Sequence, residues 1–140
     1  MNNLTKLKLL MLIGICWLAV KGGGGGVIGP DSEPGIDADG LCVMVIEESE
    51  DRHQLPDEQK NAIIGTQVME YIHSCEGEYR RVDPTDVSTL AEPWRSAMKR
   101  PRDSLPWIII SNTDPSFGYE GPYPENLDAV MELLDEAVAK

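Results

Sequence analysis

The stretch that decides the fold is Leu105-Pro106-Trp107-Ile108-Ile109-Ile110, a proline followed at once by a short apolar run rich in β-branched residues. Polar residues bound this run, with Asp103-Ser104 before it and Ser111-Asn112 after it. A bounded apolar run of this length predicts a β-strand that is buried on both faces of a sheet. Proline fits at the start of such a strand because its missing N–H breaks no ladder hydrogen bond there.

A strand, a long helix and a second strand are predicted upstream of this stretch. Residues 41–46 form a continuous apolar run that predicts a first buried strand. Over residues 56–73 apolar residues recur at every fourth position, which predicts one helix with Pro56 at its first position. Residues 79–82 predict a short second strand that ends at Asp83-Pro84.

A short helix and a C-terminal unit complete the predicted order. Thr89 and Glu92 have the spacing of a capping box, which predicts the start of a short helix. The apolar residues of that helix follow helical spacing: Trp94, Ala97 and Met98. Downstream, residues 117–120 predict a brief edge strand, and an amphipathic pattern over residues 127–138 predicts a last helix.

This order of elements resembles the thioredoxin-like fold across residues 41–140. Leu105-Pro106 before its strand is similar to the cis-proline loop of that family, and Gly118 and Gly121 are similar to the glycine-bearing turn before the family's last helix. The resemblance implies an α/β three-layer sandwich with a mixed sheet of about four strands, and a cis peptide bond at Pro106. An α/β sandwich of another topology, with an ordinary trans Pro106, is the alternative.

The residues that perform thioredoxin chemistry are missing. Redox members of the family carry Cys-x-x-Cys between the first strand and the first helix, where the helix N-terminus activates a thiol. This chain has Glu50-Asp51-Arg52-His53-Gln54 in that region, without a cysteine. Because disulfide exchange requires a thiolate, we predict a redox-inactive domain.

Cys42 and Cys75 are expected to remain separate. The strand that begins at Cys42 would span about 17 Å, and a continuous helix from Pro56 to Cys75 about 28 Å. The helix would therefore end about 10 Å beyond the start of the strand, whereas a disulfide needs Cα atoms within ~7 Å. We predict that Cys42 is buried and inert and that no disulfide joins the pair.

Residues 1–21 predict a targeting segment. Lys6 and Lys8 precede a run without charge over residues 9–20. This run is shorter than the ~17–25 residues of a membrane-spanning helix and suits the apolar region of a signal peptide. We expect export to the periplasm, the extracellular space or the outer side of a membrane. Either the segment is cleaved near Gly22 or residues 9–20 remain as a weak membrane tether.

Composition separates a linker from an acidic body. Residues 22–40 are rich in glycine, proline and acidic residues, which predicts a flexible linker before a domain over residues 41–140. The net charge is −12, and three of the 12 basic residues lie in the first 21 residues, whereas all 24 acidic residues follow them. Such a body is repelled by phosphate backbones, so nucleic acid is not an expected partner.

No metal or cofactor is expected. The two histidines, His53 and His73, lie 20 residues apart in the sequence, and no spacing of Cys, His or Asp resembles a metal site. The glycine run over residues 22–26 is not followed by the Gly-Lys-Ser/Thr of a phosphate loop.

Two functions remain open from the sequence. The first is a module that binds a protein or peptide partner in a groove beside Leu105-Pro106, flanked by Arg52 and His53. The second is an enzyme without thiols, in which His53 acts with the carboxylates of Glu50 and Asp51 as acid and base. An enzyme needs a pocket that holds His53 against a second polar group, whereas a binding module needs only an open groove or apolar patch. The absence of a paired catalytic constellation favours the binding module.

Overall fold

The computed structural model describes residues 26–27 and 35–139, and the structural statements below concern these residues. The expected targeting segment, residues 1–21, lies outside the described residues, as does most of the expected linker.

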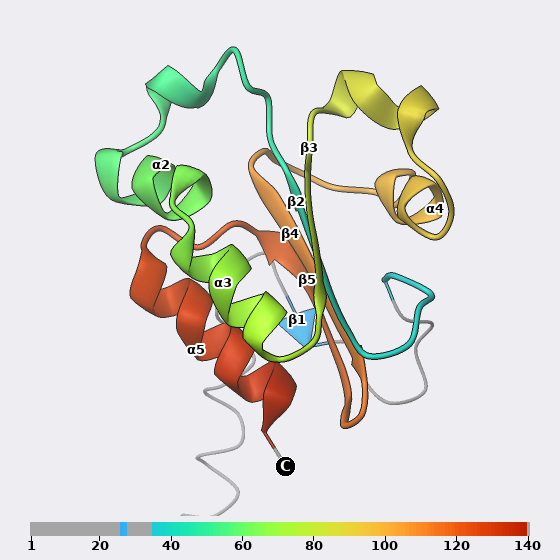
Figure 1. Cartoon of the computed structure of the whole chain (residues 1–140). Coiled ribbons are helices and arrows are strands. Elements are labelled where there is room, and N and C mark those ends of the chain that lie inside the picture. The colour runs from blue at the N-terminus through green and yellow to red at the C-terminus, as the bar shows by residue number, and fades with distance from the viewer. Residues whose placement is uncertain (1–25, 28–34, 140) are drawn as a thin grey trace, which may run out of the picture.

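A mixed β-sheet forms the middle of the molecule (Figure 1). Its strands are β1 (Gly26–Val27), β2 (Leu41–Ile46), β3 (Glu78–Val82), β4 (Trp107–Thr113) and β5 (Ser116–Pro122). They lie in the order β1-β5-β4-β2-β3, in which β2 and β3 are parallel and every other neighbouring pair is antiparallel. The sequence predicts four of these strands, and the two-residue β1 adds an edge that it does not predict.

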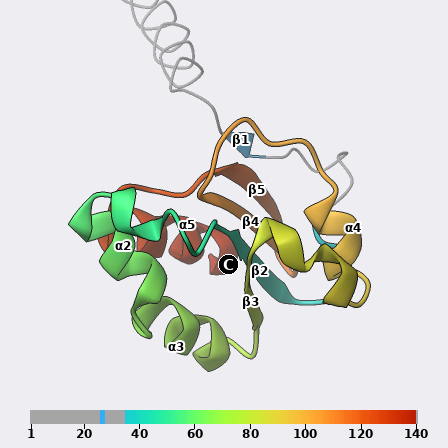
Figure 2. The ribbon, with the colours of Figure 1, turned by 90° about the horizontal axis from the view of Figure 1, so that it is seen from above.

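Helices cover both faces of the sheet, as the two ribbon views show (Figures 1 and 2). On one face lie α2 (Asp57–Ile64), α3 (Gln67–Ser74) and α5 (Leu127–Val138). The short α4 (Trp94–Met98) and the 3₁₀ helix η2 (Pro84–Thr89) lie on the other. The protein is therefore an α/β sandwich built on a mixed sheet, which confirms the predicted fold class at this level.

The central strands are apolar throughout because each of their faces is covered. In β2, Val43 and Val45 pack toward α2, α3 and α5, whereas Met44 and Ile46 pack toward α4. All four side chains are fully buried, and each contributes roughly 1.5–3 kcal/mol through removal of apolar surface from water. Their antiparallel neighbour β4 is buried from Trp107 to Asn112, which confirms the prediction of a strand buried on both faces.

The prediction of one helix over residues 56–73 is wrong. Helix α2 ends at Ile64, Gly65 is extended at φ −67° and ψ 159°, and α3 begins two residues later. Glycine and the β-branched Thr66 are poor helix formers, so the chain turns between them at little cost. The break also shifts the apolar stripe, so that Ile63 is buried and Ile64 is 47% exposed.

The prediction of a capping box at Thr89 and Glu92 is also wrong. Thr89 ends η2, and its hydroxyl donates a hydrogen bond to the carbonyl of Asp86 at 2.8 Å. The N-cap of α4 is Pro93, and the carboxylate of Glu92 accepts from both the N–H (3.1 Å) and the hydroxyl (2.6 Å) of Ser96. Glu92 thus satisfies one N–H of the first turn, and the carbonyl of Ala91 accepts from that of Arg95 at 3.0 Å. The burial predicted for the apolar residues of this helix is confirmed: Trp94, Ala97 and Met98.

Strand β4 runs three residues beyond the apolar stretch because its polar residues find partners inside the fold. The amide of Asn112 donates to the carbonyl of Ala137 in α5 at 2.6 Å. The hydroxyl of Ser111 accepts from the N–H of Ile36 at 3.0 Å, and Ile36 is itself fully buried against the sheet. Residues 35–36, which belong to the expected linker, therefore pack on the α/β body. The peptide bond between Leu105 and Pro106, just before β4, is cis.

Candidate binding site

One end of the sheet brings together the segment that follows β2 and the segment that precedes β4. These strands are antiparallel, with Ile46 paired to Trp107, so the end of β2 meets the beginning of β4. The loop after β2, which contains the 3₁₀ helix η1 (Arg52–Gln54), therefore lies beside Leu105-Pro106.

A shallow hollow of about 220 Å³ lies between these segments. It is lined by Glu47, Glu48, Asp51, Arg52, Gln54, Leu55, Leu105 and Pro106. Three of the four residues predicted for the binding face thus share one hollow: Arg52, Leu105 and Pro106. The fourth, His53, does not line it.

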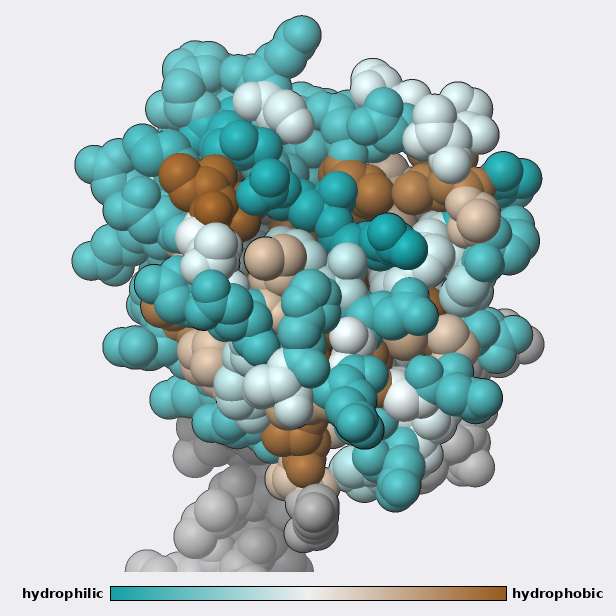
Figure 3. All heavy atoms as spheres, viewed as in Figure 1, coloured by the Kyte–Doolittle hydropathy of each residue, from teal (hydrophilic) through white to brown (hydrophobic). Residues whose placement is uncertain are grey.

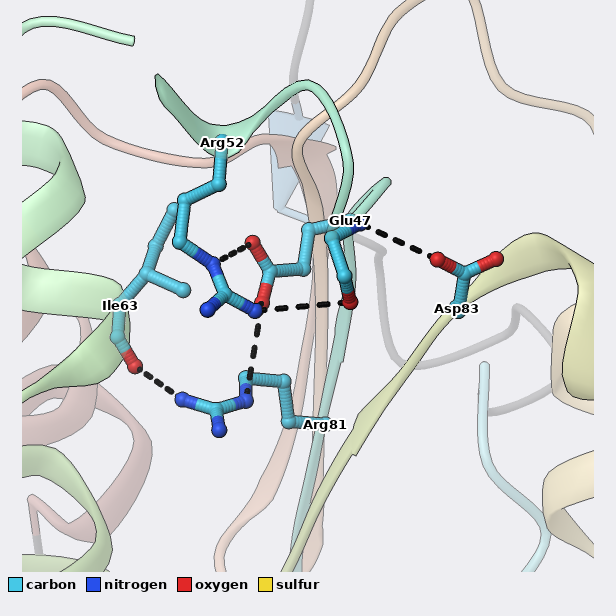
Figure 4. Close-up of polar contacts among 6 residues, drawn as sticks. Glu47, Arg52, Ile63, Arg81 and Asp83 are labelled. Atoms are coloured by element: carbon cyan, nitrogen blue, oxygen red, sulfur yellow. Dashed lines mark hydrogen bonds and ion pairs between the residues drawn. The ribbon is translucent and has the colours of Figure 1, made fainter.

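Glu47 lies at the centre of this site, and it is not among the residues predicted from the sequence. Its side chain is only 2% exposed, and its carboxylate accepts two hydrogen bonds from Arg52, at 2.9 Å from Nε and 2.5 Å from Nη2. The guanidinium of Arg81 in β3 approaches the same carboxylate at 3.6 Å and donates to the carbonyl of Ile63 at 3.0 Å. Figure 4 shows the two arginines reaching the carboxylate from different elements.

This arrangement is what a buried carboxylate requires, because a buried charge is tolerated only when it is paired and hydrogen-bonded. The bidentate pair also raises the pKa of Arg52, first through the hydrogen bond with Glu47. The guanidinium of Arg52 is consequently engaged by Glu47, and this contact joins η1 to the end of β2. A carboxylate directly after a strand buried on both faces is the sequence signal that could have pointed to Glu47.

The rim of the hollow carries carboxylates without such partners. Glu48 and Asp51 line both the hollow and an adjoining depression that also contains Glu50 and Asp83. The pKa of Glu48 is raised, first by a side-chain hydrogen bond with Asp51 and then by desolvation and neighbouring negative charges. In Figure 3 hydrophilic residues gather at the upper left of the molecule, where Figure 1 shows the loop after β2. This surface favours an approaching cation.

Asp83, which lines the adjoining depression, is instead held by hydrogen bonds. Its carboxylate accepts from the N–H of Thr85 at 3.0 Å. It also accepts from the N–H of Ser49 at 3.1 Å, a contact drawn in Figure 4. These hydrogen bonds, with that of Thr85 the largest contribution, lower the pKa of Asp83. Asp83 therefore remains ionised and connects the loop after β2 to the start of η2.

His53 is exposed and lies outside the hollow. Its Nδ1–H donates to the backbone carbonyl of Glu50 at 2.7 Å. Within the part of the chain that the structure describes, no side chain is hydrogen-bonded to the His53 ring. The loop brings Glu50, Asp51 and His53 near one another, but the geometry does not hold His53 against a second polar side chain in a pocket.

The cysteines lie away from the site. Cys42 is buried within β2 and Cys75 is half-buried at the end of α3, and both are free thiols, which confirms that they stay separate. The pKa of Cys42 is raised, chiefly by burial. A buried thiol with a raised pKa is a poor nucleophile.

The described residues contain neither a cluster suited to a metal ion nor a helix suited to crossing a membrane. Among residues 26–27 and 35–139, no group of three or more His, Cys, Asp or Glu side chains could hold a metal ion. No helix within these ranges is both long enough and apolar enough to cross a bilayer.

Comparison with models of protein families, with curated proteins and with solved structures found no match. The class of protein therefore follows from the fold and the site: an α/β sandwich with a small hollow at one end of a mixed sheet. Apolar residues form part of this hollow, and its lining includes two carboxylates, of Glu48 and Asp51, that form no salt bridge with the described residues.

Proposed function

We propose that this chain is a redox-inactive, thioredoxin-like domain that binds a protein or peptide partner at the hollow beside Leu105-Pro106. The thioredoxin-like topology is supported by the order of strands and helices from β2 to α5. It is also supported by the single parallel pair, β2 and β3, beside the antiparallel strands β4 and β5. Helices on both faces of the sheet agree with a three-layer sandwich.

The absence of thiol chemistry is part of the proposal. Between β2 and α2, where redox relatives carry paired thiols, this chain has the acidic loop and η1. Arg52 occupies that region and is bound to the buried Glu47. The buried Cys42 and the distant Cys75 offer no substitute for a thiol in the loop.

The observation that carries the proposal is the composition of the hollow. Leu55, Leu105 and Pro106 supply the apolar part of its lining. Glu48 and Asp51 supply negative charge on the rim, whereas the charge of Arg52 is balanced by Glu47. The occupant with matching chemistry is a peptide segment in which a lysine or arginine stands next to an apolar residue.

The size of the hollow supports a binding module rather than an enzyme with an organic substrate or cofactor. Pockets for such molecules usually enclose ~300–1,000 Å³, and this hollow holds about 220 Å³. A volume of this order accommodates an amino-acid side chain. Its open form fits a peptide that lies across the surface.

The proposal also includes export of the domain, either with residues 1–21 removed or with residues 9–20 kept as a tether. This part rests on the sequence alone. In the fold, Cys42 and Cys75 are both free.

A display library of random linear peptides, selected on the full chain, tests the proposed function. We expect enrichment of peptides that carry a basic residue beside an apolar one. Their affinity for the double variant Glu48→Gln/Asp51→Asn should fall about tenfold, because removal of the charge partners weakens association and orientation.

The matched control is Glu58→Gln/Asp128→Asn, which removes two exposed carboxylates from α2 and α5 at another surface. Peptides selected on the wild-type chain should bind this variant with unchanged affinity. Failure to enrich any peptide, or equal loss of affinity in both double variants, would contradict the proposal.

A further inference from the structure

The outer edge of β3 is open. Strand β3 is last in the order β1-β5-β4-β2-β3, so within the described ranges no strand pairs with its other side. The ribbon views agree that β3 forms one border of the sheet, between α3 on one side and η2 on the other (Figures 1 and 2). An open edge is a template for pairing with a further strand.

The backbone of β3 shows which of its groups point outward. The carbonyl of Val82 accepts a hydrogen bond from the N–H of Glu47 at 3.1 Å, so Val82 turns its polar groups toward β2. Because backbone groups alternate along a strand, Tyr79 and Arg81 direct their N–H and C=O groups to the outer edge. These two residues therefore offer two donors and two acceptors to a neighbouring strand.

The side chains of β3 carry opposite charges at alternate positions. Glu78 and Arg80 are both exposed, and they pair in register with Cys42 and Met44, whose side chains face α4. The guanidinium of Arg80 lies over the ring of Trp94 at 5.6 Å, which holds its charge close to the strand. The same face of the edge thus presents a negative charge and a positive charge two residues apart.

We infer that the β3 edge pairs with the β3 edge of a second copy of this chain, antiparallel and centred on Tyr79. In this register the two Tyr79 residues exchange backbone hydrogen bonds. Glu78 of each copy then lies directly opposite Arg80 of the other, and directly opposed side chains of an antiparallel pair share one face. A two-fold axis perpendicular to the sheet generates both Glu–Arg pairs at once.

Charge selects this register over the next symmetric one. Centring the pair on Arg80 would set two arginines directly opposite each other, which is destabilising. The net charge of −12 on each copy opposes association at long range. We therefore expect a weak dimer that forms as the protein concentration rises. This surface is separate from the hollow, and the inference does not depend on the proposed function.

Sedimentation velocity of the full chain over a series of concentrations tests the inference. The wild-type chain should shift from monomer toward dimer as its concentration increases. The single variants Arg80→Glu and Glu78→Arg each set like charges opposite one another at both ends of the pair, so each should weaken dimerisation about tenfold or more. The double variant Glu78→Arg/Arg80→Glu restores opposite charges and should dimerise again.

Lys99→Glu is the control, because it makes the same charge change as Arg80→Glu at an exposed position that follows α4. It should leave dimerisation close to that of the wild type. Recovery in the double variant also shows that the single variants lost pairing rather than folding. A chain that stays monomeric at every concentration would overturn the inference. Self-association that is unchanged in the single variants, or that the double variant does not recover, would also overturn the inference, because the association would then involve another surface.

Discussion

At the scale of single residues, the site depends on how one buried carboxylate is satisfied. Glu47 stands at the end of a strand buried on both faces, where an isolated charge would be strongly unfavourable. Arg52 supplies a bidentate partner from the following loop, and Arg81 a more distant one from β3. The Glu47–Arg52 ion pair thereby offsets the desolvation cost of the buried carboxylate. It also holds η1 in a fixed position, where it forms one wall of the hollow.

We predict that Arg52→Ala lowers the free energy of unfolding by about 3 kcal/mol, because it leaves Glu47 buried with only the longer contact to Arg81. Urea denaturation followed by circular dichroism measures the change. Lys60→Ala is the control, since it breaks the exposed ion pair with Asp57 and should cost less than ~1 kcal/mol. Equal costs for the two variants would show that the Glu47–Arg52 pair has no special role.

At the scale of elements, the sequence pattern predicted a strand correctly where both faces of that strand are buried. The predicted strand over residues 41–46 matches β2 residue for residue, because every side chain in it is buried. The helix over residues 56–73 was predicted as one element because its apolar spacing continues across Gly65. A single glycine in an amphipathic pattern does not reveal whether the chain will bend, since tertiary packing decides between the alternatives.

The site could be predicted in part for the same physical reason. The hollow brings Arg52, Leu105 and Pro106 together because the end of a strand and the start of its antiparallel neighbour must meet. The hydrogen-bonding state of each side chain could not be predicted. Whether Arg52 would bind a ligand or a buried carboxylate depends on where η1 places its guanidinium, and the sequence alone does not fix this.

Helices α3 and α5 are joined by a hydrogen bond from the hydroxyl of Tyr71 to the carboxylate of Asp135 at 2.6 Å. This contact raises the pKa of Tyr71 from 10.0 to about 12, first through the hydrogen bond itself. Because the folded state favours neutral Tyr71, the contribution is fully present below pH 10.0 and is lost as the pH rises toward about 12.

We predict that alkaline pH reduces the stability of the wild-type chain more than that of Tyr71→Phe. Denaturant unfolding of both proteins on either side of pH 10.0 measures the difference. Asp135→Asn should return the tyrosinate titration of Tyr71 toward its ordinary range. A titration that is the same in wild type and Asp135→Asn would contradict this assignment.

At the scale of the whole molecule, charge and sheet topology define two separate surfaces, one at the hollow and one at the outer edge of β3. The net charge of −12 opposes approach to a phosphate backbone, and in the proposed function the carboxylates of Glu48 and Asp51 would attract a basic segment. The open edge of β3 offers a second surface with a different chemistry, in which the two signs of charge alternate. A partner at the hollow and a second copy at β3 would therefore occupy separate sites.

We predict that residues 1–21 direct the chain out of the cytoplasm of a secretion-competent host. Fractionation followed by mass spectrometry of the intact protein should find either an N-terminus near Gly22 or a full-length chain attached to a membrane. Recovery of the full-length chain in the cytosol, with Met1 or Asn2 at its N-terminus, would contradict the assignment of a targeting segment.

The central claim is that a peptide binds in the hollow between η1 and Leu105-Pro106, and amide chemical-shift mapping with a display-selected peptide tests it most directly. Binding in the hollow should perturb chiefly the amide signals of residues 47–55 and of Leu105, since Pro106 has no amide hydrogen. Leu105→Ala should weaken binding, whereas Ile64→Ala, which trims an exposed apolar side chain elsewhere, should leave it unchanged. Perturbations centred on the surface that carries Glu58 and Asp128, or equal effects of the two variants, would contradict binding at the hollow.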